Sequence, residues 1–306
     1  MSRLTCKLGN SINTTFNISS MYFDNFRQQP GKRLADRLHG EVNVMLDKRT
    51  QDIFNWLKPH DTSMNYNAAK ERRQKNSGKW LLESPMYLEW IKRKNSRLWL
   101  HGKAGCGKTV LCSTVIEDIY NRCSRTGDSA VVFFYFRYDY KPPSEHENQY
   151  GQMLRSLIVQ LSSQLQMSST GLNDMYEYHL HGQRQPSNTD LALLLGKMIS
   201  MLKTVFVLLD ALDECDEIRG LLRFLKQFPD NPDGSYRFFV TSRKEVVIEE
   251  SLTHFNQVHL EEELIANDIR AFIVEQLDDV DFKEIPSDLK FEIIKRLIRD
   301  ADGMLV

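Results

Sequence analysis

The sequence predicts an α/β fold in which helices cover both faces of a parallel sheet. Short apolar runs, of the kind that form buried strands, alternate with longer segments whose apolar residues recur at helical spacing. After Leu260 only the helical spacing remains, which indicates a helical segment behind the sheet. The 306 residues, of which 41% are hydrophobic and 26% charged, are enough for a substantial core.

The first part of the chain precedes the predicted sheet. Residues 1–40 are polar and irregular, so we expect a loosely ordered N-terminal arm. Apolar residues at helical spacing predict a helix from Glu41 to Leu57. The polar segment Asn65–Gly78 is expected to form a helix and a loop at the surface, and an apolar cluster follows between Trp80 and Ile91. Residues 41–95 are therefore predicted to be a helical segment ahead of the sheet.

The elements of the sheet follow in order. Strands rich in β-branched and aromatic residues are expected at Arg97–Leu100, Ala130–Phe136, Thr204–Leu209, Tyr236–Val240 and Gln257–Leu260. Helices are expected at Thr109–Arg122, Met153–Leu165, Leu191–Leu202 and Gly220–Phe228, and behind the sheet at Ile265–Leu277 and Ser287–Arg299. These positions place the sheet domain at 96–262 and the start of a helical domain at 263–306.

The best-defined motif directly follows the first predicted strand. Gly102 to Thr109 read GKAGCGKT and fit the pattern GxxxxGK[ST] in full. Glycines let successive backbone N–H groups turn inward at a helix N-terminus, where they cradle an anion. Lys108 would reach the β- and γ-phosphates and act in catalysis, and the Thr109 hydroxyl would coordinate Mg²⁺. We expect the side chains of Lys103 and Cys106 to point outward. The predicted contacts to a nucleoside triphosphate, ATP or GTP, are Gly102, Lys103, Ala104, Gly105, Cys106, Gly107, Lys108, Thr109 and Val110.

A magnesium site beside such a loop needs a carboxylate at the end of a neighbouring strand. The third predicted strand ends in Asp210, which we predict as the metal ligand together with Thr109. Asp213 and Glu214 follow closely, and either one could orient or activate water for hydrolysis. The fourth predicted strand leads to Arg243 at the ligand side of an open α/β sheet, where it is either a contact to the γ-phosphate or a surface arginine.

Charge and cysteine content narrow the class of protein. The net charge of -1 provides no overall basic field, so nucleic acid is not an expected partner, and the basic clusters at 70–75 and 92–94 are interpreted as solvated helix faces. No apolar run is long enough to span a bilayer, and the first residues lack the apolar core of a secretory signal. The five cysteines form no CxxC pair, which favours reduced thiols and a cytoplasmic protein.

Taken together, these motifs resemble the NACHT family of STAND P-loop NTPases, in particular the fungal NLR-like proteins and the nephrocystin-3-like N-terminal NACHT region. GKAGCGKT resembles the Walker A motif of that family, and LLDALDEC resembles its extended Walker B motif. FVTSR, which ends at Arg243, resembles the sensor-1 strand, and FFYFRYD resembles an aromatic second strand. The resemblance spans roughly Ile53 to the end of the chain.

The resemblance implies an ASCE-type P-loop NTPase fold with a five-stranded sheet, followed by a helical domain and a winged helix. It implies Mg²⁺-dependent binding of ATP or GTP, slow hydrolysis and a nucleotide-gated switch to an oligomer in signal transduction and innate immunity. By position, Lys108 and Thr109 become phosphate and metal contacts, and Asp210 the metal carboxylate. Asp213 and Glu214 become hydrolytic candidates and Arg243 the sensor. The expected protein partners are a second copy or related NACHT proteins.

The sequence departs from that family at both ends. The arm before Ile53 is short for an effector domain and no repeats follow, so the chain is expected to be truncated. A binding-only module that regulates a full-length relative without significant turnover is therefore the main alternative. A metabolic P-loop kinase is less favoured because no second substrate site is evident. A DNA-acting ATPase is less favoured because the charge is nearly neutral.

Overall fold

The described residues form a sheet of five parallel strands in the order β2-β3-β4-β1-β5. The computed structural model describes residues 48–74, 77–123, 129–140, 147–165, 171–229, 235–260, 262–277 and 286–300. The strands are β1 Ser96–His101, β2 Ser129–Tyr135, β3 Thr204–Asp210, β4 Tyr236–Ser242 and β5 Asn256–His259. Each bound lies within two residues of the expectation, and the parallel sheet flanked by helices confirms the predicted fold class.

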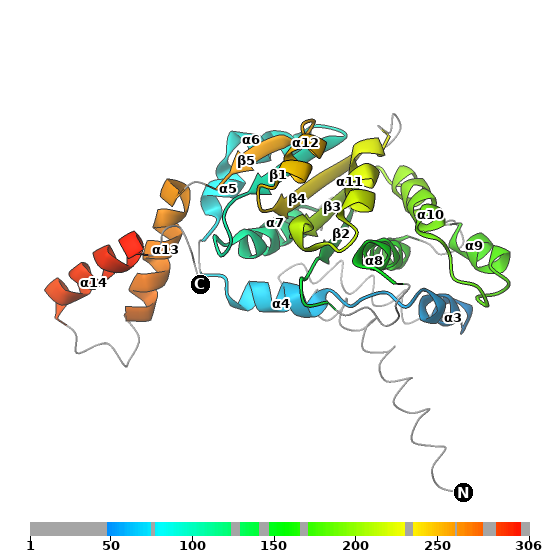
Figure 1. Ribbon diagram of the computed structural model, residues 1–306, viewed down its shortest axis with the longest axis horizontal. Helices are drawn as coiled ribbons and strands as arrows, with labels where there is room; N and C mark the ends of the chain where they lie inside the picture. The colour runs from blue at the N-terminus through cyan, green and yellow to red at the C-terminus, as the bar shows by residue number, and fades with distance from the viewer. Residues whose placement is uncertain are drawn as a thin grey trace, which may run out of the picture.

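Helices surround this sheet (Figure 1), and they occur along the chain in the following order. Ahead of β1 are α3 Lys48–Leu57, α4 Ser63–Glu71, α5 Lys79–Glu83 and α6 Pro85–Lys92. Between the strands are α7 Lys108–Cys123, α8 Gln149–Gln164, α9 Leu172–Tyr178, α10 Asn188–Ser200, the 3-10 helix η2 Leu212–Glu214, α11 Ile218–Gln227 and α12 Val246–Ser251. After β5 come α13 Glu262–Leu277 and α14 Ser287–Asp300. The arm expected at 1–40, the first residues of the helix expected from Glu41, and residues 301–306 lie outside the described residues.

Local signals explain how several of these helices begin. Ser187 caps α10: its side chain accepts a hydrogen bond from the Asp190 N–H, and Asp190 bonds back to the Ser187 N–H. Asn148 caps α8 by accepting from the Gly151 N–H at 2.8 Å. Pro85 takes the first position of α6. Proline has no N–H, and this costs nothing there because the N–H of the first helical residue has no partner within the helix.

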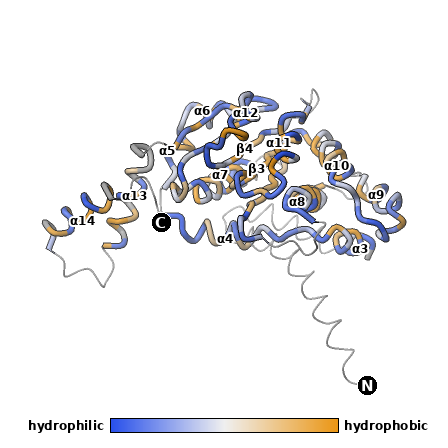
Figure 2. Tube along the Cα trace, in the orientation of Figure 1, coloured by the Kyte–Doolittle hydropathy of each residue, from blue (hydrophilic) through white to orange (hydrophobic). Residues whose placement is uncertain are grey.

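Two hydrophobic clusters lie on the two faces of the sheet, because successive residues of a strand point to opposite sides. On β3, Val205, Val207 and Leu209 face the cluster formed with α3 and α8 to α12. Phe206 and Leu208 face the cluster formed with α4 to α7 and α13. Figure 2 shows hydrophobic stretches in α8 and α10, which contribute many residues to the first cluster. The sheet is therefore the middle layer of three.

The pairing of strands fixes which side chains meet at the carboxyl edge. Strand β4 lies between β1 and β3, and its register places Val240 opposite Leu209 and Ser242 opposite His101. Residues that follow β1, β3 and β4 therefore gather at one edge of the sheet, although they come from distant parts of the sequence.

Helix α4 differs from the expected surface segment. Tyr66 and Ala69 are buried, and Tyr66 packs against Phe133 of β2 at a ring-centroid distance of 5.3 Å. The basic cluster near residue 70 is likewise not a simple solvated face, since Lys70 and Arg73 both pair with Glu117 of α7. The expected helix and its exposed residues are present, but its buried side was missed because the apolar positions of α4 are few and separated by polar residues.

Helices α9 and α12 were not expected from the sequence. Both are short: α9 spans Leu172–Tyr178, and α12 spans Val246–Ser251 and starts with two valines. Such short segments carry too few turns to show helical spacing, and β-branched residues favour strands when taken alone. Tertiary packing makes these two segments helical, since Leu172 and Ile248 are both fully buried in the core.

The helical segment expected after Leu260 is present as α13 and α14, which lie together at one end of the molecule beyond α5 (Figure 1). Asp268 of α13 accepts hydrogen bonds from the Gly78 N–H at 3.0 Å and the Trp80 indole N–H at 3.2 Å. These bonds join α13 to the segment ahead of β1. Among the helices of the described ranges, none is both long enough and apolar enough to cross a membrane.

Candidate functional site

The loop between β1 and α7 has the backbone conformation that its glycines predict. Gly105 and Gly107 adopt φ values of 70° and 85°, a left-handed region that side-chain-bearing residues rarely enter. The Leu111 N–H bonds to the Gly107 carbonyl at 2.9 Å, so the helical ladder of α7 begins directly behind the loop. The N–H groups of the first helical turn have no partner within a helix, and they lie where an anion would be held.

Lys108 lies over this loop. Its ammonium donates to the carbonyl oxygens of Gly102 at 3.0 Å and Lys103 at 2.6 Å, and lies 3.6 Å from the Cys106 Sγ. The loop thus keeps a positive charge beside the N-terminus of α7. Both features attract a phosphate group.

The expectation for Cys106 was wrong: its side chain is only 2% exposed and belongs to the hydrophobic cluster under α7. The reason is that the loop passes so close to Gly102 that the Cys106 side chain packs against this glycine. A Cβ atom at Gly102 would lie 2.9 Å from both the Cys106 Sγ and the Leu260 Cβ, so only glycine fits there. Lys103 is exposed, as expected.

Asp210 lies at the end of β3 with both carboxylate oxygens engaged. Oδ2 accepts a hydrogen bond from the Thr109 hydroxyl at 2.8 Å, and Oδ1 accepts one from the Thr241 hydroxyl at 2.6 Å. The structure thus brings together Thr109 and Asp210, the two residues predicted as metal ligands. Thr241, at the end of β4, was not singled out from the sequence.

Burial raises the pKa of Asp210 to about 6, because the carboxylate loses the solvation that stabilises its charge. The hydrogen bonds from Thr241 and Thr109 and the charge of Lys108 act in the opposite direction, and the nearby Glu214 raises the pKa further. A buried carboxylate of this kind gains most from a cation placed beside it.

The oxygen atoms of Thr109 and Asp210 form a donor set that suits Mg²⁺, a hard cation that prefers oxygen ligands. Within the described ranges there is no group of three or more His, Cys, Asp or Glu residues that could hold a metal. Mg²⁺ in nucleotide sites is commonly held by one or two protein oxygens together with phosphate and water, so the two residues fit that arrangement. Bound there, the ion would neutralise charge on the phosphates.

A left-handed residue turns the chain after Asp210. Ala211 has φ 59° and ψ 54°, a conformation that is uncommon for a residue with a side chain, and its N–H donates to the Thr241 hydroxyl at 3.0 Å. The short η2 helix follows and carries both Asp213 and Glu214. The bend therefore keeps the two acids beside the carboxyl edge of the sheet.

Asp213 and Glu214 have different partners. Asp213 is 3% exposed and accepts from the Arg243 backbone N–H at 2.9 Å and from the Arg243 Nε at 2.5 Å. Glu214 accepts from the Tyr138 N–H at 2.9 Å through Oε2. The structure therefore places the predicted sensor Arg243 against one of the two hydrolytic candidates.

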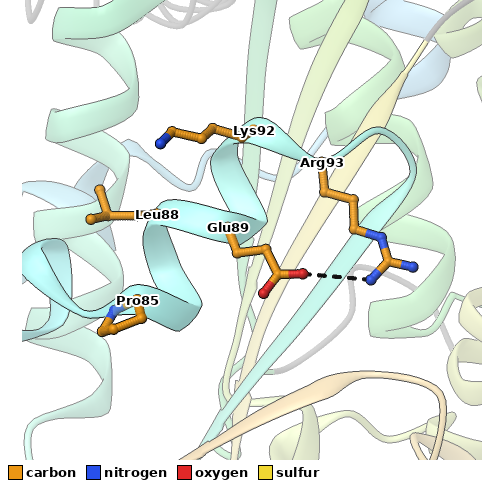
Figure 3. A pocket seen from close by; sticks show the side chains of 5 residues that line it. All are labelled: Pro85, Leu88, Glu89, Lys92 and Arg93. Carbon is orange, nitrogen blue, oxygen red and sulfur yellow. Dashed lines mark ion pairs between the residues drawn. The ribbon is translucent and has the colours of Figure 1, made fainter.

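A separate hollow of about 460 Å³ lies on α6 and is lined by Pro85, Leu88, Glu89, Lys92 and Arg93 (Figure 3). These residues come from α6 and the position directly after it, ahead of the amino end of β1, whereas the glycine loop follows the carboxyl end of that strand. Two of the lining residues, Glu89 and Arg93, are one helical turn apart and form an ion pair of 3.6 Å. The hollow therefore lies at the opposite end of β1 from the predicted phosphate site.

A family comparison covers most of these site residues. The sequence profile of the family described as Nephrocystin 3, N-terminal, matches residues 76–243, which is more than half of the chain. The chain belongs to the nephrocystin-3 N-terminal family. The match begins ahead of α5 and ends at Arg243, so the glycine loop, Asp210, Glu214 and Thr241 all fall within the nephrocystin-3 N-terminal region.

Solved structures also resemble this member of the nephrocystin-3 N-terminal family. C. elegans PCH-2 matches at 13% sequence identity and a TM-score of 0.34. Aeropyrum pernix ORC1, solved in complex with DNA, matches at 14% sequence identity and a TM-score of 0.37. Each of these two matches covers 80% of this chain and 60% of the other chain. Drosophila ORC bound to DNA matches at 8% identity and a TM-score of 0.32, over 85% of this chain and 45% of the other. No curated protein matches the sequence significantly.

Proposed function

We propose that this chain binds a nucleoside triphosphate with Mg²⁺ at the glycine loop, hydrolyses it slowly, and uses the bound nucleotide to control association with a second copy or a related protein. The hydrogen bond between Thr109 and Asp210 carries the proposal. It joins the first turn of the phosphate-loop helix to the end of β3 across an intervening strand, which is where a magnesium-bound triphosphate needs both groups.

Within this proposal each side chain has a distinct role. Lys108 binds the phosphates, and Thr109 and Asp210 hold the metal. Glu214 is the better candidate for orienting water, because its hydrogen bond in the described structure is to a single backbone N–H. Asp213 instead holds Arg243. Charge on a γ-phosphate would compete with Asp213 for the Arg243 guanidinium.

The switch part of the proposal rests on the resemblance to the NACHT family together with this placement of Arg243. The side chain of Arg243 is 49% exposed, so it can reorient without breaking the core. We also propose that the nucleotide-binding unit spans residues 96–262 and that α13 and α14 begin a helical domain at 263–306.

One observation favours the alternative of a binding-only module. Both oxygens of Asp213 are engaged by Arg243, and Oε2 of Glu214 accepts a hydrogen bond from the Tyr138 N–H, so both acids already have protein partners in this arrangement. In the alternative, the nucleotide binds and the acids keep these partners. Turnover separates the two functions, whereas nucleotide binding is common to both.

The decisive experiment measures binding of ATP and GTP with Mg²⁺ and phosphate release in the same samples of the full chain. Lys108→Ala removes the charge in the loop, and Lys226→Ala, on the exposed face of α11, is the matched control. We expect binding by the parent and the control, loss of binding in Lys108→Ala, and slow phosphate release. Binding without release would support the binding-only module, and absence of binding by the parent would refute both functions.

A further inference from the structure

The hydroxyl of Thr241 has two partners in the site, although no role was predicted for this residue from the sequence. The side chain is fully buried at the end of β4. Its hydroxyl donates to the Asp210 Oδ1 at 2.6 Å and accepts from the Ala211 N–H at 3.0 Å. A hydroxyl carries a single proton, so the proton goes to Asp210 and a lone pair serves Ala211.

We propose that Thr241 is a positioning residue for the metal carboxylate: it fixes the orientation of Asp210 and, through Ala211, the bend that carries the two following acids. The inference rests on the proposed function, since it assigns a role within the same magnesium-nucleotide site.

The two threonines beside Asp210 are not equivalent in this role. Thr109 is itself a predicted metal ligand, and its hydroxyl lone pairs would turn toward the ion when the site is filled. Thr241 lies on the other oxygen, Oδ1, and has no part in the predicted coordination. Among the described residues, its hydroxyl is therefore the hydrogen-bond donor that holds the carboxylate once Thr109 is engaged by the metal.

Threonine suits the position better than a more flexible residue. Its β-branched side chain has little freedom at χ1, and the β-strand restricts its backbone. Both restrictions fix the direction of the hydroxyl. Residues that orient a metal ligand in this way commonly change metal affinity by 10–100-fold when they are removed.

Thr241→Val removes the hydroxyl and keeps the branched shape, Thr241→Ser keeps the hydroxyl, and Ser162→Ala removes a buried hydroxyl of α8 far from the site. For each full-length protein, affinity for a fluorescent ATP or GTP analogue is measured in EDTA and then during titration with Mg²⁺. Thermal unfolding reports the fold.

We expect Thr241→Val to keep its affinity in EDTA within about threefold of the parent and to need roughly 10–100 times more Mg²⁺ for half-saturation. Thr241→Ser and Ser162→Ala should titrate like the parent. An unchanged Mg²⁺ requirement in Thr241→Val, or an equal loss with and without Mg²⁺, would overturn the inference while leaving the proposed function intact. Failure of the parent to bind nucleotide would instead refute the proposed function.

If Thr241→Val does not fold, Thr241→Ala provides the same test with a smaller side chain. A folded Thr241→Ala that needs more Mg²⁺ would support the positioning role. If neither variant folds while Thr241→Ser folds and binds Mg²⁺ normally, the hydroxyl belongs to the fold alone, and the inference is overturned.

Discussion

Arg243 holds Asp213 through its backbone N–H and its Nε, at 2.9 Å and 2.5 Å. The carboxylate is almost completely buried, whereas half of the arginine side chain is exposed. A backbone bond and a side-chain bond from one residue to both oxygens leave little freedom to the acid. We therefore interpret Asp213 as the residue that positions Arg243, and Glu214 as the acid that is available to water.

This difference predicts distinct outcomes for the two acids. Glu214→Gln should slow phosphate release in single-turnover assays by about 100-fold or more, because it removes a general base, while nucleotide affinity stays within threefold. Asp213→Asn should mainly change nucleotide affinity, because it weakens the hold on Arg243. Normal release by Glu214→Gln, combined with loss of release in Asp213→Asn, would reverse the assignment.

The same glycine-to-alanine substitution should have opposite effects in the phosphate loop and in helix α10. Gly107→Ala forces a side chain into a φ of 85°, which should cost about 1–2 kcal/mol in unfolding free energy and abolish nucleotide binding. Gly196→Ala lies within α10, where an added Cβ meets nothing within 4 Å, and should stabilise by about 0.5–1 kcal/mol. Urea unfolding compares the two, and a shift of the same sign in both would contradict this explanation.

The sequence predicts the strands, the phosphate loop and Asp210 because each depends on a local pattern: apolar runs of strand length, glycine spacing, and an acid at a strand end. The position of β4 between β1 and β3 does not follow from a local pattern, because strand pairing is set by long-range packing. That position brings Thr241 to Asp210, so the motif FVTSR, although it contains Thr241, does not by itself show that the hydroxyl reaches the carboxylate.

The same reasoning explains the other differences. Cys106 is buried because Leu260, after β5, comes close to Gly102, a contact between distant segments. The pairing of Arg243 with Asp213 also depends on how the ends of β3 and β4 lie side by side. Sequence reasoning located both charged residues at the correct edge but left open whether they contact each other or a ligand.

The raised pKa of Asp210 predicts a pH-dependent cost of keeping this carboxylate buried. Its pKa rises from an ordinary 3.8 to about 6, mainly through burial, so the folded state binds the proton more tightly than the unfolded state. Stability should therefore fall as pH rises from about 4 to 6, and the full cost, about 3 kcal/mol, should persist above pH 6.

Asp210→Asn removes this titration while keeping the shape of the side chain. We expect the variant to be more stable than the parent at pH 7.5, with a difference that shrinks toward zero near pH 4. It should also lose Mg²⁺-dependent nucleotide binding. Urea unfolding of both proteins across this pH range provides the measurement, and a difference that is constant with pH would contradict the assignment.

The outer edge of the sheet gives the final prediction, because β2 is an edge strand whose free backbone groups are covered by α8. The Gln160 amide accepts from the Phe133 N–H at 3.0 Å and donates to the Phe133 carbonyl at 2.8 Å. Gln164 does the same for Val131, at 3.1 Å and 3.0 Å. The two amides thus occupy the place that another strand would take.

Gln160→Leu keeps a side chain of similar size but leaves both buried groups of Phe133 without a partner. We expect a loss of at least about 2 kcal/mol in unfolding free energy and a stronger tendency to aggregate, since the strand edge becomes available for pairing. Gln227→Leu, at an exposed position of α11, controls for the added leucine. Equal urea midpoints for the two variants would show that the glutamine amides do not stabilise the edge of the sheet.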